Sequence, residues 1–223
     1  MQRRIFFLGE WFSDNGNRLF SMSQLEQALK SFLLDETLLK ELASVLSRFC
    51  ENDVTIYKQL REIASDNLTE LLLELWNWKL IIPTRSSKCG EWDSRILLAE
   101  PGESYEMPNI SKMLVKNAQL SGVWDSQKAI IDLFKVMGEM EWRKIPDLVL
   151  EINHGCIHHT ISGARIGIAC ARKGLKNKTG AMIAVLKGSG IISPKLMAFA
   201  EVARSTSPVY EFNPSVYAEP RAF

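Results

Sequence analysis

The chain has 223 residues, of which 46% are hydrophobic and 24% charged, a composition typical of a globular protein with one or two domains. No apolar run approaches about 18 residues, so we expect no membrane-spanning helix. The apolar stretch at the N-terminus is interrupted too early to be a secretory signal. The four cysteines are widely spaced and form no CxxC pair, which favours reduced thiols. We therefore expect a cytoplasmic protein.

The net charge of +1 hides a division along the chain. Residues 1–160 carry 18 basic and 23 acidic side chains, whereas residues 161–223 carry 9 basic and 3 acidic ones. The 49 residues between Glu151 and Glu201 contain no carboxylate. A solvated face usually mixes both signs, so this asymmetry favours a polyanionic partner for the C-terminal part over a merely solvated surface.

In the N-terminal half, apolar periodicity and capping residues predict three helices followed by an extended region. In chain order we expect an arm (1–20), an amphipathic helix (35–49) with Asp35 as its cap, a shorter helix (54–65), a third helix begun by Asn67, an extended exit at Ile81 to Pro83, and a strand, "RILLAE" (95–100).

The C-terminal half follows a similar plan. In chain order we expect a joining helix (126–140), a helix (144–155) with Pro146 in its first turn, a second helix (162–174), a third (177–190) ended by Gly188 and Gly190, and a hairpin of residues 196–202 and 208–213.

The two halves also share sequence. At an offset of 110 residues, "NLTELLLELWNWKLIIP" matches "NKTGAMIAVLKGSGIIS", so that Asn67 corresponds to Asn177 and Thr69 to Thr179. Further on, "YEMPN" corresponds to "YEFNP" at an offset of 105. The matches keep the same order, which indicates a tandem duplication. The fold class expected is mainly α with small β-hairpins, that is, α+β.

The stretch "IGIACARKGLKNKTGAMIAVLKGSGIISP" combines Ala169 in a helix, a Gly174–Leu175 corner, Asn177 as the polar cap of the next helix, Leu186 near the end of that helix, and a glycine-isoleucine exit. In these features about 50 residues of the second half resemble the winged helix-turn-helix superfamily. The first half has no Gly-Leu corner and matches less well. The resemblance implies two tandem winged-helix domains, residues 1–122 and 123–223.

The resemblance also implies a way of binding double-stranded DNA, with the third helix of the second domain in the major groove and the wing on the flanking backbone. Asn177 and Lys178 would face base edges, and the cations around the corner would contact phosphates. The residues implied are Arg165, Arg172, Lys173, Lys176, Asn177, Lys178, Thr179, Gly180, Lys187, Arg204 and Ser205.

The corresponding helix of the first half carries Asp66, Glu70 and Glu74, which would repel DNA. We therefore expect the first domain to be a scaffold, a dimerisation module or a partner-binding module. Trp78 and Trp92 are its candidate partner contacts, because aromatic side chains are enriched at interfaces. The alternative is that both rings pack within the domain.

All three histidines fall in "NHGCIHHT", which places His154, Cys156, His158 and His159 together as weak candidates for metal ligands. The spacing lacks the separated pairs of a structural zinc site, and a solvated corner between helices is the main alternative. No phosphate-binding loop, dinucleotide-binding motif or HExxH sequence is present, so we expect neither an enzyme nor a cofactor.

The leading hypothesis is a sequence-specific or general DNA-binding protein, a transcriptional regulator, for which a homodimer is expected if its site is palindromic. The alternative is an assembly subunit of a chromosome-segregation, transcription-machinery or genome-defence complex, and RNA binding by the same basic face is a third hypothesis. One feature distinguishes these hypotheses. DNA binding requires that Arg172, Lys173, Lys176 and Lys178 form one continuous patch with the wing, and that no carboxylate of the first domain covers this patch.

Overall fold

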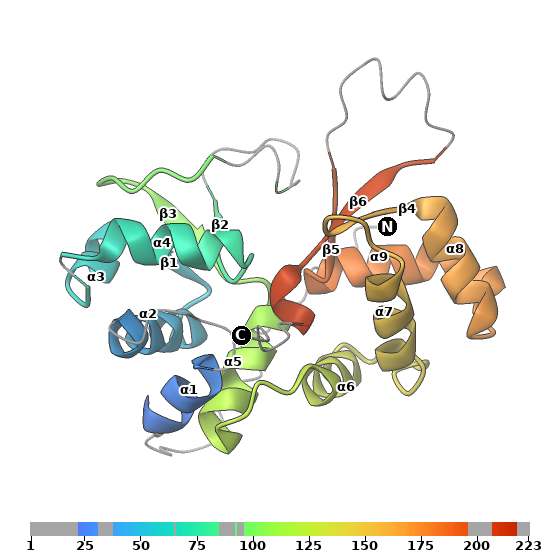
Figure 1. The fold of residues 1–223 in the computed structure, drawn as a ribbon, viewed down its shortest axis with the longest axis horizontal. Helices are drawn as coiled ribbons and strands as arrows, with labels where there is room; N and C mark the ends of the chain where they lie inside the picture. Colours follow the sequence, from blue (N-terminus) through green and yellow to red (C-terminus); the bar gives the residue numbers. More distant parts are fainter. Residues whose placement is uncertain are drawn as a thin grey trace.

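The computed structural model describes residues 22–30, 38–64, 66–84, 92, 96–195 and 207–217. The N-terminal half, coloured blue to green, and the C-terminal half, gold to red, lie side by side with helix α5 between them (Figure 1). Over the described residues the fold consists of helices with two three-stranded antiparallel sheets, so the α+β class is confirmed.

The N-terminal half has one bundle of helices and one sheet. Its elements are α1 (Met22–Leu29), α2 (Leu39–Glu51), β1 (Val54–Ile56), α3 (Tyr57–Arg61), α4 (Leu68–Asn77), β2 (Ile82–Pro83) and β3 (Ser104–Glu106). Helix α5 (Asn109–Ser121) follows and leads to the C-terminal half.

The elements of that half are α6 (Ser126–Val136), α7 (Ile145–His154), β4 (Thr160–Ser162), α8 (Gly163–Arg172), the 3-10 turn η4 (Lys176–Lys178), α9 (Thr179–Ser189), β5 (Ile192–Pro194), β6 (Val209–Phe212) and the 3-10 turn η5 (Pro214–Tyr217).

Both sheets have the same topology. The strand order is β1-β3-β2 in one and β4-β6-β5 in the other, so the last strand of each half lies in the centre. Tyr105 of β3 pairs with Thr55 and Pro83, and Tyr210 of β6 holds the equivalent place. Both tyrosines are buried. The sequence repeat therefore coincides with a repeat of strands and helices.

Two predictions for the N-terminal half are wrong. Residues 54–56 form strand β1 rather than the start of a helix, because three β-branched residues favour extended backbone and Thr55 is buried between two exposed neighbours. The predicted strand at 95–100 is not observed over its described residues 96–100. Leu97 and Ala99 pack against the hydrophobic core, and the strand pairing is made by β3 instead.

Other boundaries also differ from the prediction. The helix expected over 126–140 ends at Val136, shortly before Gly138 with its positive φ of 70°. The third helix runs to Ser189, with Gly188 inside it and Gly190 at its end. On one side β6 pairs with Ile192–Pro194, which lies before the strand expected at 196–202. The expected strand itself, the arm at 1–20 and the cap at Asp35 lie outside the described residues.

Helix α5 was not predicted from the sequence. Nine of its thirteen residues are buried, including Ser111, Lys112, Asn117 and Gln119. Its apolar residues divide between two cores, which it therefore joins. Val115 and Ala118 belong to the core of the N-terminal half, and Ile110, Met113 and Leu114 belong to that of the C-terminal half.

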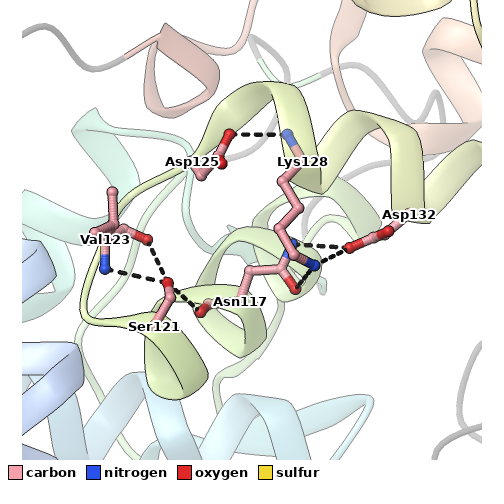
Figure 2. Close-up of polar contacts among 6 residues, drawn as sticks. All are labelled: Asn117, Ser121, Val123, Asp125, Lys128 and Asp132. Atoms are coloured by element: carbon pink, nitrogen blue, oxygen red, sulfur yellow. Dashed lines mark hydrogen bonds and ion pairs between the residues drawn. The ribbon is translucent and has the colours of Figure 1, made fainter.

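The corner between α5 and α6 is closed by hydrogen bonds, and the predicted boundary after residue 122 falls in it (Figure 2). Ser121 Oγ donates to the carbonyl of Asn117 at 2.8 Å, and Asp125 caps α6 by accepting from the amide of Lys128 at 2.8 Å. Asp132 accepts from Lys128 Nζ at 2.5 Å and from Asn117 Nδ2 at 3.3 Å. These contacts fix the direction in which α6 leaves α5.

Helices α4 and α9 end in the same way. The amide of Leu80 donates to the carbonyl of Leu75, and the amide of Ile191 donates to the carbonyl of Leu186, after a residue with positive φ. That residue is Lys79 (φ 52°) in the first case and Gly190 (φ 78°) in the second.

The fully buried Asn213 joins these two helix ends. Its Nδ2 donates to the carbonyl of Lys79 at 3.3 Å and to that of Gly190 at 3.1 Å. Ser111 Oγ of α5 donates to the same Lys79 carbonyl, and Lys79 Nζ lies 3.5 Å from Glu211 Oε1. The halves are therefore connected by a buried polar junction beside α5.

Gly190 and Gly188 provide a matched test of this junction. A Cβ on Gly190 would lie 2.6 Å from Cβ of Pro108, at a backbone angle that L-residues avoid, whereas a Cβ on Gly188 would meet nothing within 4 Å. We expect Gly190→Ala to lower the free energy of unfolding by about 2–4 kcal/mol and Gly188→Ala to raise it by about 0.5–1 kcal/mol. Urea unfolding of both variants would measure this, and equal stabilities would contradict the packing at Pro108.

Candidate nucleic-acid interface

The segment expected to bind DNA is α8, η4 and α9. Helix α8 begins at a capped residue, because Ser162 Oγ accepts from the amide of Arg165 at 3.3 Å. It ends at the Gly-Leu corner expected from the sequence. Gly174 has a φ of 71°, the amide of Leu175 donates to the carbonyl of Cys170 at 2.7 Å, and Leu175 is buried. The corner is thus a helix end closed by glycine and anchored by leucine.

The start of α9 differs from the expectation. Asn177 lies in η4 and is exposed, and the residue before the helix is Lys178, whose side chain makes no capping hydrogen bond. Thr179 Oγ1 instead donates to the carbonyl of Lys176 at 2.9 Å. The expected role of Asn177 as helix cap is therefore wrong, and its amide points to no capping partner in α9.

The outward face of α9 carries few polar side chains. Met182 and Leu186 face the core, while the exposed positions are Gly180, Ala181, Ala184, Lys187 and Gly188. Reading a base edge needs a side chain that can donate or accept hydrogen bonds. Along α9 itself, only Lys187 among these exposed residues has such a group at its tip.

Two of the expected cations form ion pairs with carboxylates of the same half. Arg172 Nη1 lies 2.5 Å from Glu151 Oε1, and Lys178 Nζ lies 2.7 Å from Glu141 Oε1. These hydrogen bonds lower the pKa of both carboxyl groups and raise the pKa of Lys178. Neither contact is evident from the sequence, because the carboxylates come from α7 and from the loop before it, upstream of the carboxylate-free stretch.

The remaining expected cations are arranged around the corner and along α9. Arg165 is exposed and donates to the carbonyl of Gly155 at 3.0 Å. Lys176 and Lys187 are exposed, and Lys173 is half-buried. Of the corner cations, Arg172 and Lys178 are therefore paired with carboxylates of the C-terminal half, whereas the side chain of Lys176 is exposed.

The wing residues Arg204 and Ser205 lie outside the described residues. The chain on either side of them is held in place. The amide of Lys195 donates to the carbonyl of Val209 at 2.9 Å, and Ser207 Oγ accepts from the amide of Ala164 at 2.8 Å. The second contact fixes the C-terminal end of this connection next to the start of α8.

The two tryptophans expected to bind a partner pack within the molecule. Trp92 is only 6% exposed, and its amide donates to Ser193 Oγ at 3.1 Å. Trp78 is half-buried against the core of the N-terminal half, and its Nε1 donates to Glu74 Oε1 at 2.9 Å. The alternative stated from the sequence, packing within the first domain, describes Trp78, whereas Trp92 is buried with a contact to the C-terminal half. On α4 the exposed apolar residue is Leu73, at 48%.

The histidine segment forms a tight turn. His158 and His159 both have positive φ, 49° and 58°, and Ile157 and Thr160 exchange backbone hydrogen bonds on either side of them. Strand β4 follows directly, which the sequence analysis did not predict. Burial raises the pKa of the Cys156 thiol to about 11, and its Sγ donates to the carbonyl of Ile152. Over the described residues, no three His, Cys, Asp or Glu side chains gather in a way that could hold a metal ion.

The fold defines a class, an α+β protein made of two halves with the same order of elements. The chain belongs to the protein family whose model matches residues 23–219, a match that includes both halves. Comparisons with curated proteins and with solved structures returned no match. Among the described residues, no helix is both long and apolar enough to cross a membrane.

The histidine turn predicts a stabilising substitution. A two-residue turn with positive φ at both positions is best filled by Asn-Gly. Because histidine is strained in this conformation, His158→Asn/His159→Gly should raise the free energy of unfolding by about 1 kcal/mol. The control His154→Asn, outside the turn, should change it by less than about 0.5 kcal/mol. Thermal unfolding compares the three proteins, and a less stable double variant would contradict the turn.

Proposed function

We propose that the chain is a cytoplasmic DNA-binding protein whose C-terminal half binds double-stranded DNA as a winged-helix module. The element order of that half, helix, strand, two helices and two strands around a glycine-closed corner, supports this assignment. The observation that carries the proposal is the exposed basic surface formed by the corner and α9. In this surface the side chains of Lys176 and Lys187 are exposed to solvent. Such a surface attracts a polyanion.

The binding mode that fits this surface is contact with the phosphate backbone. The outward face of α9 offers Gly180, Ala181, Ala184 and Gly188, which let the helix approach DNA closely but do not distinguish bases. Asn177, exposed just before α9, is the side chain best suited to a base edge. Of the two modes expected from the sequence, general DNA binding is therefore favoured over recognition of one operator, and a regulator of this kind would act with little sequence preference.

The second candidate function is that of an assembly subunit. It is favoured by the outer surface of α4, where exposed Leu73 lies one turn from exposed Glu70. An acidic surface with an apolar centre suits a protein partner or a second copy better than DNA. On this account the N-terminal half would bind protein while the C-terminal half binds DNA, and the two functions are compatible in one chain.

Salt-dependent binding to a labelled duplex of mixed sequence tests the proposal. Between about 50 and 200 mM salt, affinity should fall steeply, and Lys176→Ala/Lys187→Ala should make the slope of log K against log salt shallower by about 1.8 if each lysine contacts a phosphate. Fluorescence anisotropy measures both quantities.

The matched control is Lys58→Ala/Arg61→Ala, which removes two exposed cations from α3 of the N-terminal half. The control should keep the slope of the unmodified protein. Equal slopes for both double variants would contradict DNA binding by the α9 surface, and an absence of binding at about 50 mM salt would reject the proposal for this chain.

A further inference from the structure

The loop between α6 and α7 brings three charged groups together at the start of α9. Glu141 Oε1 accepts from Lys178 Nζ at 2.7 Å, and Glu141 Oε2 lies 2.9 Å from Lys144 Nζ. One carboxylate thus bridges two ammonium groups, one from the loop and one from the residue before α9. Both lysines remain about half exposed, at 45% and 48%.

An aromatic ring of the same loop lies beside two further cations, one from the end of α6 and one from the loop. Lys135 Nζ lies 4.4 Å from the centre of the Trp142 ring, and the guanidinium carbon of Arg143 lies 5.0 Å from it. Trp142 itself packs against the core of the C-terminal half. Cations near an aromatic face are held in place without losing their charge. The basic surface therefore extends from α9 onto the loop.

Backbone hydrogen bonds give this loop a defined shape. The amide of Trp142 donates to the carbonyl of Glu139 at 3.3 Å, and the amide of Lys144 donates to that of Glu141 at 2.8 Å. Glu139 Oε1 also accepts from the amide of Glu141 at 3.2 Å. Glu141 is thus placed by its own backbone in the position between the two lysines.

We propose that the α6–α7 loop is a second phosphate-binding element of the surface formed by α9, and that Glu141 occupies the place of a DNA phosphate when DNA is absent. The inference rests on the proposed function, since it names further contacts for the same polyanion. A carboxylate and a phosphate both accept charge-assisted hydrogen bonds from ammonium groups. A phosphate that replaced Glu141 would keep both lysines paired, whereas the displaced carboxylate would return to water.

Glutamate is charged at neutral pH, and the hydrogen bonds from Lys178 and Lys144 lower the pKa of Glu141 further, so its carboxylate competes with phosphate. Two consequences follow. Removing the charge of Glu141 should strengthen DNA binding, and removing the loop cations should weaken it. Both effects should depend on the position of these side chains in the loop, so the same change of charge elsewhere on the protein should alter DNA binding less.

Anisotropy titrations of the full chain test the first consequence. Glu141→Gln should bind the mixed-sequence duplex about two- to fivefold more tightly than the unmodified protein, as expected for removal of an exposed ion-pair partner. Glu62→Gln, the same charge change at an exposed position next to α3 of the N-terminal half, should change affinity by less. Equal effects of the two substitutions would overturn the role of Glu141.

The second consequence is tested by Arg143→Ala/Lys144→Ala, which should make the salt slope shallower by about 1.8 if both cations contact phosphates. If that slope is unchanged while Lys176→Ala/Lys187→Ala makes it shallower, the inference about the loop is overturned and the proposed function stands. If the unmodified protein fails to bind the duplex, both are rejected. Circular dichroism should show the same helix content in every variant, because all the substituted side chains are exposed or half-buried.

Discussion

The structure depends on the burial of helix α5 between two hydrophobic cores. A helix packed on two sides has no face left for water, so its polar side chains need partners inside the protein. Each buried polar residue of α5 has one. Ser111 donates to Lys79, Lys112 to Asp53, Asn117 to Asp132 and Gln119 to Ser47. These partners come from both halves, so the helix that completes each core also fixes the position of one relative to the other.

The junction beside α5 uses the repeated ends of α4 and α9. In both helices the last turn is closed by a residue with positive φ, and the buried amide of Asn213 donates to the carbonyls of both residues. Glycine fills this position in the C-terminal half, where Pro108 allows no side chain. In the N-terminal half Lys79 fills it, and its ammonium group lies over the Trp76 ring and near Glu211. A shared backbone motif thus has a different role in each half, as a close contact in one and a buried ion pair in the other.

The same division appears in the charges. In the N-terminal half the surface of α4 is acidic with exposed Leu73, whereas in the C-terminal half the exposed positive charge lies at the corner before α9 and, on α9 itself, at Lys187. Carboxylates from α7 and the preceding loop pair with Arg172 and Lys178, so the free basic surface is smaller than the sequence indicates and is moved toward Lys176 and Lys187. The covering carboxylates belong to the C-terminal half itself. A phosphate that binds such a surface has to replace a carboxylate that is already paired, so the internal counterions oppose the binding of a polyanion.

The sequence alone determined the features that depend on local interactions. The Gly174–Leu175 corner, the place of Pro146 in the first turn of α7 and the strand around Tyr210 follow from backbone preferences and short-range periodicity. The internal repeat pairs Tyr105 with Tyr210, which lie in β3 and β6, but the strand of the first half was expected at 95–100 rather than at β3. Tertiary structure decided what long-range packing controls: the burial of α5, strand β1 in place of a helix start, the burial of Trp92 against Ser193, and the pairing of Lys178 with Glu141. In each case the deciding partner lies far away in the sequence, and no local pattern records which residue a side chain will meet once the chain has folded.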